Sequence, residues 1–397
     1  MRKRGRAFII SIGIMMAAAA LSGCGKKAEE AAVTTEASVE TTEETKTIVL
    51  ETEPTTEAET EPQGPEERKE VDGKIQSYLT TTTGKFSTSS SLIASVPMTG
   101  EMVDVAKANR RPVAVMMSND KASLPQYGIN RADVVYEAPV EGDMNRFMSI
   151  FEDYDDLERI GSVRSCRTYY TYFAREYDAI YAHYGQSTFA VPYLKNVDNI
   201  NGIDSTGGNA YYRTKDKKAP HNAYTSGAKL NKTIGQLGYR TSYSDTYTGH
   251  FQFAGGTGTY VPAESDAKDA YKMYPSYTMN NPWFEYNESD GKYYRFQYGG
   301  KHNGDSGQIA VRNVIFQYVE WGHYASTDYL NINVHKGGAG YVFTGGKCVP
   351  VSWKKDGDFG PTRYYDSEGK EVMLNKGKTW ICIVGADRFD KAEIYGK

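Results

Sequence analysis

The apolar positions between residues 109 and 243 follow two spacings in turn. Short apolar or alternating runs are typical of strands, and apolar residues three or four positions apart are typical of one helix face. The predicted strands are 112–117, 132–137, 145–153 and 178–183. The predicted helices are 165–177, with Tyr169, Tyr172, Phe173 and Tyr177 on one face, and 188–197. Strands that alternate with helices predict an α/β layer arrangement for this part of the chain.

From residue 283 onward the pattern changes to strands at short intervals. The predicted strands are 293–298, 310–320, 330–334, 340–343, 348–353 and 380–384. Turn dipeptides such as Asp290-Gly291, Gly345-Gly346 and Asp356-Gly357 separate them, as in an antiparallel sheet. The expected fold is an α+β or α/β domain at 96–243, a Tyr- and Gly-rich connector at 244–282, and a mainly antiparallel β domain at 283–397.

The N-terminus has the pattern of an export signal. Residues 7–21 are apolar or small and follow four basic residues, but 15 residues are too few to span about 30 Å of hydrocarbon comfortably. The run ends in Leu21-Ser22-Gly23-Cys24, which fits lipoprotein processing with cleavage before Cys24 and a diacylglyceryl group on its thiol. We therefore predict a signal peptide at 1–23 and a lipid anchor on Cys24. The alternative is an uncleaved membrane helix with an incidental cysteine.

Residues 24–95 are predicted to be a disordered tether. Glu, Thr, Ala and Pro dominate, and residues 25–70 carry a net charge of −9 with almost nothing large enough for a core. A solvated spacer is the simpler interpretation, and an acidic partner-binding tail is the other. Because the whole chain carries −4 and the first 24 residues +4, residues 71–397 carry only about +1. This balance and the absence of a basic motif exclude a strongly basic nucleic-acid-binding face.

The cysteines leave their pairing open. With Cys24 assigned to lipid, Cys166, Cys348 and Cys382 remain, and an odd number cannot form a complete disulfide framework. Cys348 and Cys382 lie in predicted strands and either pair or stay as buried thiols. Cys166 stands next to Arg167, whose charge is expected to lower the thiol pKa, and it is a candidate nucleophile.

Several motifs of the folded part, taken together, are specific. They are Arg111-Pro-Val-Ala-Val-Met-Met, Ala132-Asp-Val-Val-Tyr-Glu-Ala, Glu141-Gly-Asp-Met-Asn-Arg-Phe-Met, Ile160-Gly-Ser-Val-Arg-Ser-Cys-Arg, Tyr177-Asp-Ala-Ile-Tyr-Ala-His, Lys218-Ala-Pro-His-Asn and Gly360-Pro-Thr-Arg-Tyr-Tyr-Asp. In these motifs the chain resembles the YerB-like bacterial lipoproteins over nearly all of 109–243 and 283–385. The resemblance implies a two-part fold on a lipid tether and no reaction, because the function of that family is unknown. Cys166 stands where the resemblance implies a small residue such as Ala.

The segment 159–170 is the first candidate site. Ser165 is a plausible N-cap of the helix that follows, so that Arg164 precedes the helix and Arg167 lies in its first turn. Cations are unfavourable there unless an anion compensates, and arginine binds carboxylate or phosphate in a bidentate manner. The predicted ligand-binding residues are Arg146, Arg164, Arg167, His183 and His221. The alternative is an internal salt bridge from these arginines to Glu137, Glu141 or Asp143.

The carboxylates Glu137, Glu141 and Asp143 and the imidazole of His183 are the catalytic candidates. Two carboxylates suggest a glycosidase, although Glu137 and Glu141 on an extended strand lie about 13 Å apart, beyond the ~5–9.5 Å that such enzymes use. His183 ends a predicted strand and is a candidate base for Ser187 or Cys166. The alternative, a structural residue that caps the strand, is the more frequent role of a lone histidine at a strand end. No hydrolase elbow, zinc, phosphate-loop or dinucleotide motif is present in the sequence, so no cofactor or metal is expected.

All 32 tyrosines fall after residue 70, and several lie where burial is difficult. These are Tyr211, Tyr212, Tyr243, Tyr247, Tyr271, Tyr274 and Tyr277. Exposed aromatic platforms suit sugar rings and peptides, whereas core tyrosines keep only the hydroxyl at the rim.

These features predict a lipid-anchored binding or scaffold protein on the outer face of the bacterial membrane. Its expected partners are the membrane, through the anchor, and a cell-wall polymer or envelope protein. The alternative function is a peptidoglycan-modifying enzyme that uses a carboxylate or His183.

Overall fold

The computed structural model describes residues 93–263 and 266–397. The predicted signal peptide, Cys24 and the predicted tether up to residue 92 lie outside the described residues. Within the described chain, no helix is long and apolar enough to cross a membrane.

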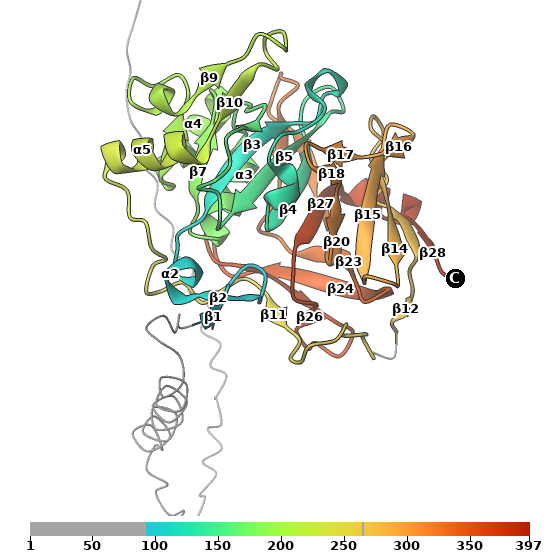
Figure 1. Ribbon diagram of the computed structural model, residues 1–397. Coiled ribbons are helices and arrows are strands. Elements are labelled where there is room, and N and C mark those ends of the chain that lie inside the picture. Colours follow the sequence, from blue (N-terminus) through green and yellow to red (C-terminus); the bar gives the residue numbers. More distant parts are fainter. Residues whose placement is uncertain (1–92, 264–265) are drawn as a thin grey trace, which may run out of the picture. The chain divides into compact units, whose positions relative to one another are not determined.

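One large sheet of eleven strands organises the molecule (Figure 1). Its order is β12-β24-β23-β20-β27-β4-β5-β3-β7-β8, and β25 pairs with β24. The strands of the first part are β3 (Val113–Ser118), β4 (Val134–Pro139), β5 (Asn145–Phe151), β7 (Ile180–His183) and β8 (Asn199–Asn201). The others are β12 (Lys268–Asp269), β20 (Asn313–Val319), β23 (Gly338–Thr344), β24 (Lys347–Lys355), β25 (Thr362–Tyr365) and β27 (Thr379–Gly385).

The two parts of the chain join inside this sheet. Strand β27 pairs in parallel with β4, with Thr379 opposite Val134 and Cys382 opposite Glu137, and it also pairs in parallel with β20. All seven residues of β20 and of β27 and all six of β4 are buried. Backbone hydrogen bonds therefore run without a break from the α/β part into the β-rich part.

A second, six-stranded antiparallel sheet covers one face of the C-terminal part. It contains β13 (Lys272–Tyr274), β14 (Trp283–Asn287), β15 (Lys292–Gln297), β16 (Gly300–Lys301), β19 (Ala310–Val311) and β28 (Glu393–Tyr395). Its side chains Met273, Phe284 and Tyr293 pack with Phe316 and Trp380 of the large sheet. The predicted fold class, an α/β part followed by a mainly antiparallel β part, is confirmed.

Four α-helices are described: α2 (Val105–Ala108), α3 (Thr168–Glu176), α4 (Val191–Leu194) and α5 (Gly227–Leu237). The remaining strands are short: β1 (Ile93–Ser95), β2 (Met102–Asp104), β6 (Ile160–Gly161), β9 (Tyr212–Arg213), β10 (Ala223–Thr225), β11 (Gln252–Phe253), β17 (Asn303–Gly304), β18 (Gly307–Gln308), β21 (Trp321–His323), β22 (Leu330–Ile332) and β26 (Met373–Leu374). Short 3-10 segments are η1 (Lys121–Ser123), η2 (Ile129–Arg131), η3 (Thr188–Ala190), η4 (Gly207–Ala210) and η5 (Ala386–Lys391).

Helix α3 begins three residues later than expected. Its N-cap is Arg167, in extended conformation, and not Ser165. The prediction of Ser165 as N-cap is wrong because the segment before the helix is held as an extended chain. Arg164 donates its N–H to Met116 O at 2.9 Å, and Cys166 donates to Gly185 O at 2.9 Å.

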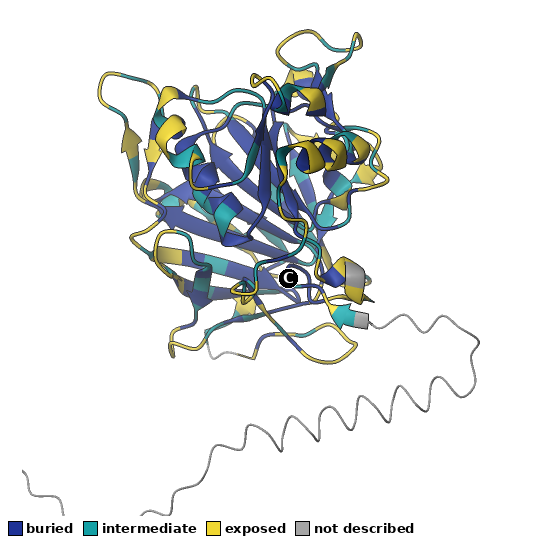
Figure 2. Ribbon diagram, turned by 90° about the vertical axis from the view of Figure 1, so that its left-hand side faces the viewer, coloured by how far each residue is buried: buried dark blue, intermediate teal, exposed yellow. Residues whose placement is uncertain are grey.

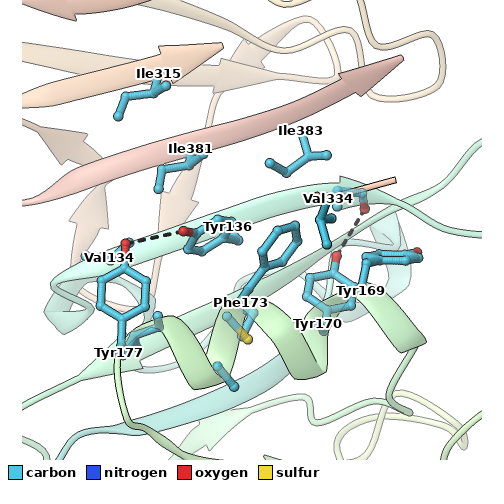
Figure 3. Packing of buried hydrophobic residues seen from close by; sticks show 14 of the residues in the cluster. Val134, Tyr136, Tyr169, Tyr170, Phe173, Tyr177, Ile315, Val334, Ile381 and Ile383 are labelled. Carbon is cyan, nitrogen blue, oxygen red and sulfur yellow. Dashed lines mark hydrogen bonds between the residues drawn. The ribbon is translucent and has the colours of Figure 1, made fainter. Parts of the chain in front are cut away.

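The core on the α3 face of the large sheet is aromatic (Figure 3). Tyr136 of β4 stacks on Phe173 of α3 with ring centroids 4.4 Å apart, and the hydroxyls of Tyr136 and Tyr177 lie 3.3 Å apart. Tyr169 donates its hydroxyl to Pro139 O at 2.5 Å, and Tyr170 donates to Arg146 O at 2.9 Å. These hydrogen bonds allow tyrosine to fill a core position without an unsatisfied hydroxyl. Figure 2 shows the sheet as buried, with exposed residues on the surrounding helices and loops.

The hypothesis of exposed tyrosine platforms is wrong for three of the seven tyrosines, and none of the seven is fully exposed. Tyr211, Tyr243 and Tyr277 are buried. Tyr212, Tyr247, Tyr271 and Tyr274 are half-buried. The buried ones use backbone or carboxylate acceptors for the hydroxyl; Tyr277, for example, donates to Glu137 O and Ile383 O at 2.9 and 2.7 Å.

The three described cysteines are free thiols, and all are buried. Strand β24, which carries Cys348, is three strand spacings from β27, which carries Cys382, or about 14 Å at ~4.8 Å per spacing. This exceeds the ~7 Å limit between the Cα atoms of a disulfide, so the pairing alternative is wrong. Burial raises the pKa of Cys166 to about 12 and outweighs the lowering by Arg167 and Arg146, so the thiolate expected from the neighbouring charge does not form near neutral pH.

Candidate functional site

Three arginines gather beyond the carboxyl end of β4. Arg146 is the second residue of β5, and Arg164 and Arg167 lie in the extended segment that leads into α3. The main-chain hydrogen bonds of Arg164 to Met116 O in β3 and of Cys166 to Gly185 O place this segment between β3 and residues 184–186. Tyr184 adds a third bond by donating its N–H to Arg164 O at 3.0 Å. The sheet thus fixes the backbone from which the guanidinium groups extend.

Arg146 is a buried cation. Its residue is 6% exposed, and its Nη1 donates to Ser165 O at 2.7 Å and to Ser165 Oγ at 3.2 Å. It forms no ion pair with any described residue. Burial, followed by the charges of Arg167 and Arg164, lowers the pKa of Arg146 to about 10. The protein therefore holds a positive charge in its interior with only neutral oxygen atoms as partners.

Arg167 has a counter-ion. Its Nε and Nη2 donate to the two carboxylate oxygens of Glu141 at 2.6 and 2.5 Å. Of the three acids considered as internal partners from the sequence, Glu141 is the one that pairs with this arginine. Arg167 also lies over the ring of Tyr329, 5.2 Å from its centroid. This side chain is consequently part of the structural support of the cluster.

Arg164 is half-buried and forms no ion pair among the residues that the structure describes. Its one side-chain hydrogen bond is from Nη1 to Pro220 O at 3.2 Å. His221 follows Pro220 in the chain, and burial lowers its pKa, as do the charges of Arg164 and Lys217, against the opposing effect of Asp120. The Nδ1 atom of His221 is buried without a hydrogen-bond partner in the described structure. Arg164 and His221 therefore lie together with unused donor or acceptor capacity.

The side chain of His183 forms its hydrogen bonds with residues outside the arginine cluster. Its side chain is buried, with Nδ1 2.8 Å from Gly185 O and Nε2 3.2 Å from Asn199 Oδ1, and burial lowers its pKa. Its ring is hydrogen-bonded to neither Ser187 nor Cys166, the two nucleophiles considered from the sequence. Both neighbours are acceptor oxygens, because Asn199 uses its Nδ2 to donate to Leu194 O and Val197 O. A neutral imidazole carries one N–H and donates to one of these oxygens at a time, so the ring is held by fixed neighbours, as expected of a structural histidine.

The three candidate carboxylates have three different environments. Glu137 is fully buried, and it accepts from Arg295 Nη2 at 2.9 and 2.8 Å, from Asn145 and Asn280 at 2.9 and 3.0 Å, and from Trp380 at 3.0 Å. Glu141 pairs with Arg167. Asp143 is exposed in a turn, with a positive φ of 56°. They do not form a pair of carboxyl groups around a shared substrate position.

Arg295, the partner of Glu137, was not recognised from the sequence. A signal was present, because Tyr293, Arg295 and Gln297 share the buried side of an alternating strand. A charged residue at an inward-facing strand position implies a buried partner of opposite charge.

Comparison with known proteins gives consistent matches. Residues 98–240 match the family model described as "Protein of unknown function (DUF3048) N-terminal domain", and residues 273–381 match the corresponding C-terminal domain. The chain is 32% identical over 302 residues to the Bacillus subtilis (strain 168) protein named "Putative lipoprotein YerB", which covers 72% of this chain and 85% of the relative. The crystal structure of the YerB protein from Bacillus subtilis superposes with a TM-score of 0.67 at 29% identity, over 76% of this chain and 99% of that one.

Proposed function

The chain belongs to the DUF3048 family, and its Bacillus subtilis relative is named as a putative lipoprotein. We therefore propose that this chain is a lipid-anchored binding protein on the outer face of the bacterial cell membrane. Its ligand would be an anion bound between Arg146 and Arg164. The observation that carries the proposal is Arg146, a cation that is more than nine-tenths buried and forms no ion pair within the described chain; Glu141, an acid whose charge acts on it, is already paired with Arg167.

The energetic reasoning concerns what an unpaired buried guanidinium costs. Moving a charge out of water is unfavourable by several kcal/mol unless a partner of opposite charge compensates. Glu141 compensates Arg167, whereas Arg146 and Arg164 share only carbonyl and hydroxyl oxygens and repel each other. An incoming carboxylate or phosphate would relieve this repulsion and accept several hydrogen bonds at once.

The surroundings favour an anion in two further ways. No side chain caps the N-terminus of α3, so its positive dipole end adds to the charge of Arg167 and Arg164. Envelope polymers rich in carboxylate or phosphate are abundant where a lipoprotein would be anchored, and a wall-derived anion is therefore the proposed ligand class. A peptidoglycan-modifying activity has less support, because Glu137 and Glu141 are each already paired with an arginine.

The test is retention of the full-length protein, in detergent, on purified peptidoglycan and wall polymers. The Arg164→Gln variant should lose at least tenfold in retention at low salt, because it removes a positive charge that would contact the anion. Since Arg164 is only half-buried, the substitution should leave the fold intact. The control Lys195→Gln removes an equal charge from an exposed residue after α4 and should bind like wild type. Wild-type protein that is not retained, or an Arg164→Gln variant that binds equally well, would count against the proposal.

A further inference from the structure

A second basic site lies at the other end of strand β4. A cavity of about 600 Å³ opens between η2, which precedes β4, and the segment 375–378, which precedes β27. The loop 256–258 and residues of β15 and β19 complete its wall. A volume of this size suits a small ligand rather than a protein surface. The arginine cluster stands beyond the opposite, carboxyl end of β4.

Four cationic side chains line the cavity against a single carboxylate. The cations are Lys292, Arg312, Lys376 and Lys378, and the acid is Glu101. None of the four forms an ion pair with any residue in the described ranges, whereas eight of the fourteen described arginines do. Asp133 and Glu101 act on Lys378 electrostatically without pairing with it, and the cavity keeps an excess of positive charge.

The two inner cations are held by neutral oxygen atoms. Arg312 donates through Nη1 to Asp290 O at 2.7 Å and to Gly291 O at 3.2 Å, and Lys378 donates to Asn130 O. Lys292 and Lys376 are exposed at the rim. The inner pair is thus fixed in position, while the outer pair is able to close on a ligand.

The loop beside these cations presents backbone N–H groups. Gly256, Thr257 and Gly258 donate no backbone hydrogen bond within the described chain. A Cβ atom at Gly256 or Gly258 would meet nothing within 4 Å, so packing does not explain the glycines, although Gly256 has a φ of +89°. Amide groups next to lysine and arginine are the combination that proteins use for phosphate oxygens.

Asn130 lies in the wall of the cavity and is fixed by the protein itself. It donates through Nδ2 to Gly307 O at 3.1 Å. Its Oδ1 has no hydrogen-bond partner in the described structure, but this atom is buried and lies against Gly304, which is not part of the cavity wall. The cations and the exposed loop 256–258 are therefore the polar groups that identify the ligand.

We propose that this cavity binds the phosphate group of a phosphate ester. The cations and the 256–258 amides bind the phosphate oxygens. The site does not depend on the arginine cluster, so it adds a second ligand position to the molecule. Its ligand is either a soluble phosphate ester or a unit of a phosphodiester polymer, which share this chemistry.

Isothermal titration of the full-length protein in detergent tests the proposal. The probes are glycerol 3-phosphate as the monoester, glycerophosphoglycerol as the diester, inorganic phosphate, and galacturonate as a carboxylate that carries hydroxyls. Glycerol 3-phosphate or the diester should bind saturably and at least fivefold more tightly than galacturonate, and inorganic phosphate should compete with them for the site. The tighter of the first two identifies the soluble or the polymeric source.

Variants separate this site from others. The double variant Lys292→Gln/Lys376→Gln changes only exposed side chains and should raise the Kd at least tenfold. Lys232→Gln on the exposed side of α5 should leave the Kd unchanged. The proposal is overturned if neither phosphate ester binds, if galacturonate binds as tightly, or if Lys232→Gln weakens binding as much as the double variant.

Discussion

Buried charged residues in this protein are of two kinds, those with a partner of opposite charge and those without. Glu137 with Arg295, and Glu176 with Lys355, are pairs in which both side chains are fully buried. Arg146 has only neutral partners, and Glu152 lies near Asp133, a second acid. Paired charges stabilise a structure only if both members are present, whereas an unpaired group marks a position where protonation or a ligand completes the site.

Glu152 is the clearest titrating residue. Tyr243 donates its hydroxyl to Oε1 at 2.5 Å, and Oε2 is buried without a partner in the described structure. Burial, with a smaller contribution from Asp133, raises the pKa of Glu152 to about 9. Between the unfolded-state pKa near 4.5 and this value, the folded protein binds one proton more than the unfolded chain. Stability is therefore highest below this window and falls as the pH rises through it.

We predict that the wild-type free energy of unfolding falls by up to about 1.4 kcal/mol per pH unit from Glu152 alone between pH 6 and 9. Glu152→Gln keeps an acceptor for Tyr243 and should flatten this dependence in urea unfolding. Exposed Glu158→Gln is the control and should leave the slope unchanged. Equal slopes for wild type and Glu152→Gln would mean that this carboxyl group is already ionised in the folded state.

At the scale of single elements, apolar spacing predicted eight of the eleven strands of the large sheet and the existence of α3, because these elements bury apolar side chains at regular intervals. It missed the short strands β8, β12 and β25. It did not predict α5, since Gly227–Leu237 contains two glycines and few large apolar residues. What defines α5 is its ends: Ser226 accepts from Lys229 N at 3.3 Å, and Gly238 takes a left-handed conformation with a φ of +68°. Such local signals are short and frequent in any sequence.

Gly235 inside α5 and Gly238 at its C-cap provide a matched pair of substitutions. A Cβ atom at Gly235 or Gly238 would meet nothing within 4 Å, so space does not distinguish them. Gly235 is inside the helix, and Gly235→Ala should stabilise the protein by about 0.5–1 kcal/mol. Gly238→Ala should destabilise it by about 1 kcal/mol, because alanine disfavours the left-handed conformation. Thermal unfolding measures both, and shifts of the same sign would contradict this account of the helix end.

At the scale of the whole molecule, the family and the two-part fold could be predicted from the sequence, since their motifs are local. The contacts between the parts could not. Arg295 of β15 meets Glu137 of β4 although 158 positions separate them, and its guanidinium lies 4.6 Å from the ring centroid of Trp380. Likewise, the cations of the cavity come from three separate places in the chain, Lys292, Arg312 and the segment 375–378, and no spacing in the sequence brings these three together. The sequence predicted which arginines form the cluster, but it left their acidic partner open among three residues. The structure identifies Glu141 as the partner of Arg167.

The shared sheet and the Glu137–Arg295 pair predict that both parts unfold together. All four tryptophans, Trp283, Trp321, Trp353 and Trp380, lie in the C-terminal part, whereas α3 and α5 lie in the N-terminal part. Tryptophan fluorescence and far-ultraviolet circular dichroism should therefore follow one transition in urea, with equal midpoints. Glu137→Gln, a change in the N-terminal part, leaves Arg295 buried without its counter-ion and should lower the free energy of unfolding by about 3–5 kcal/mol in both signals.

A matched second variant tests whether the loss comes from the uncompensated charge. Glu137→Gln combined with Arg295→Met removes both charges and should recover part of the stability lost in the single variant, because no buried cation then lacks a partner. If Glu137→Gln shifted only the circular dichroism transition and left the fluorescence midpoint unchanged, the two parts would be independent folding units. The continuous pairing of β4 with β27 argues for the single transition, because neither strand remains buried on its own if the other unfolds.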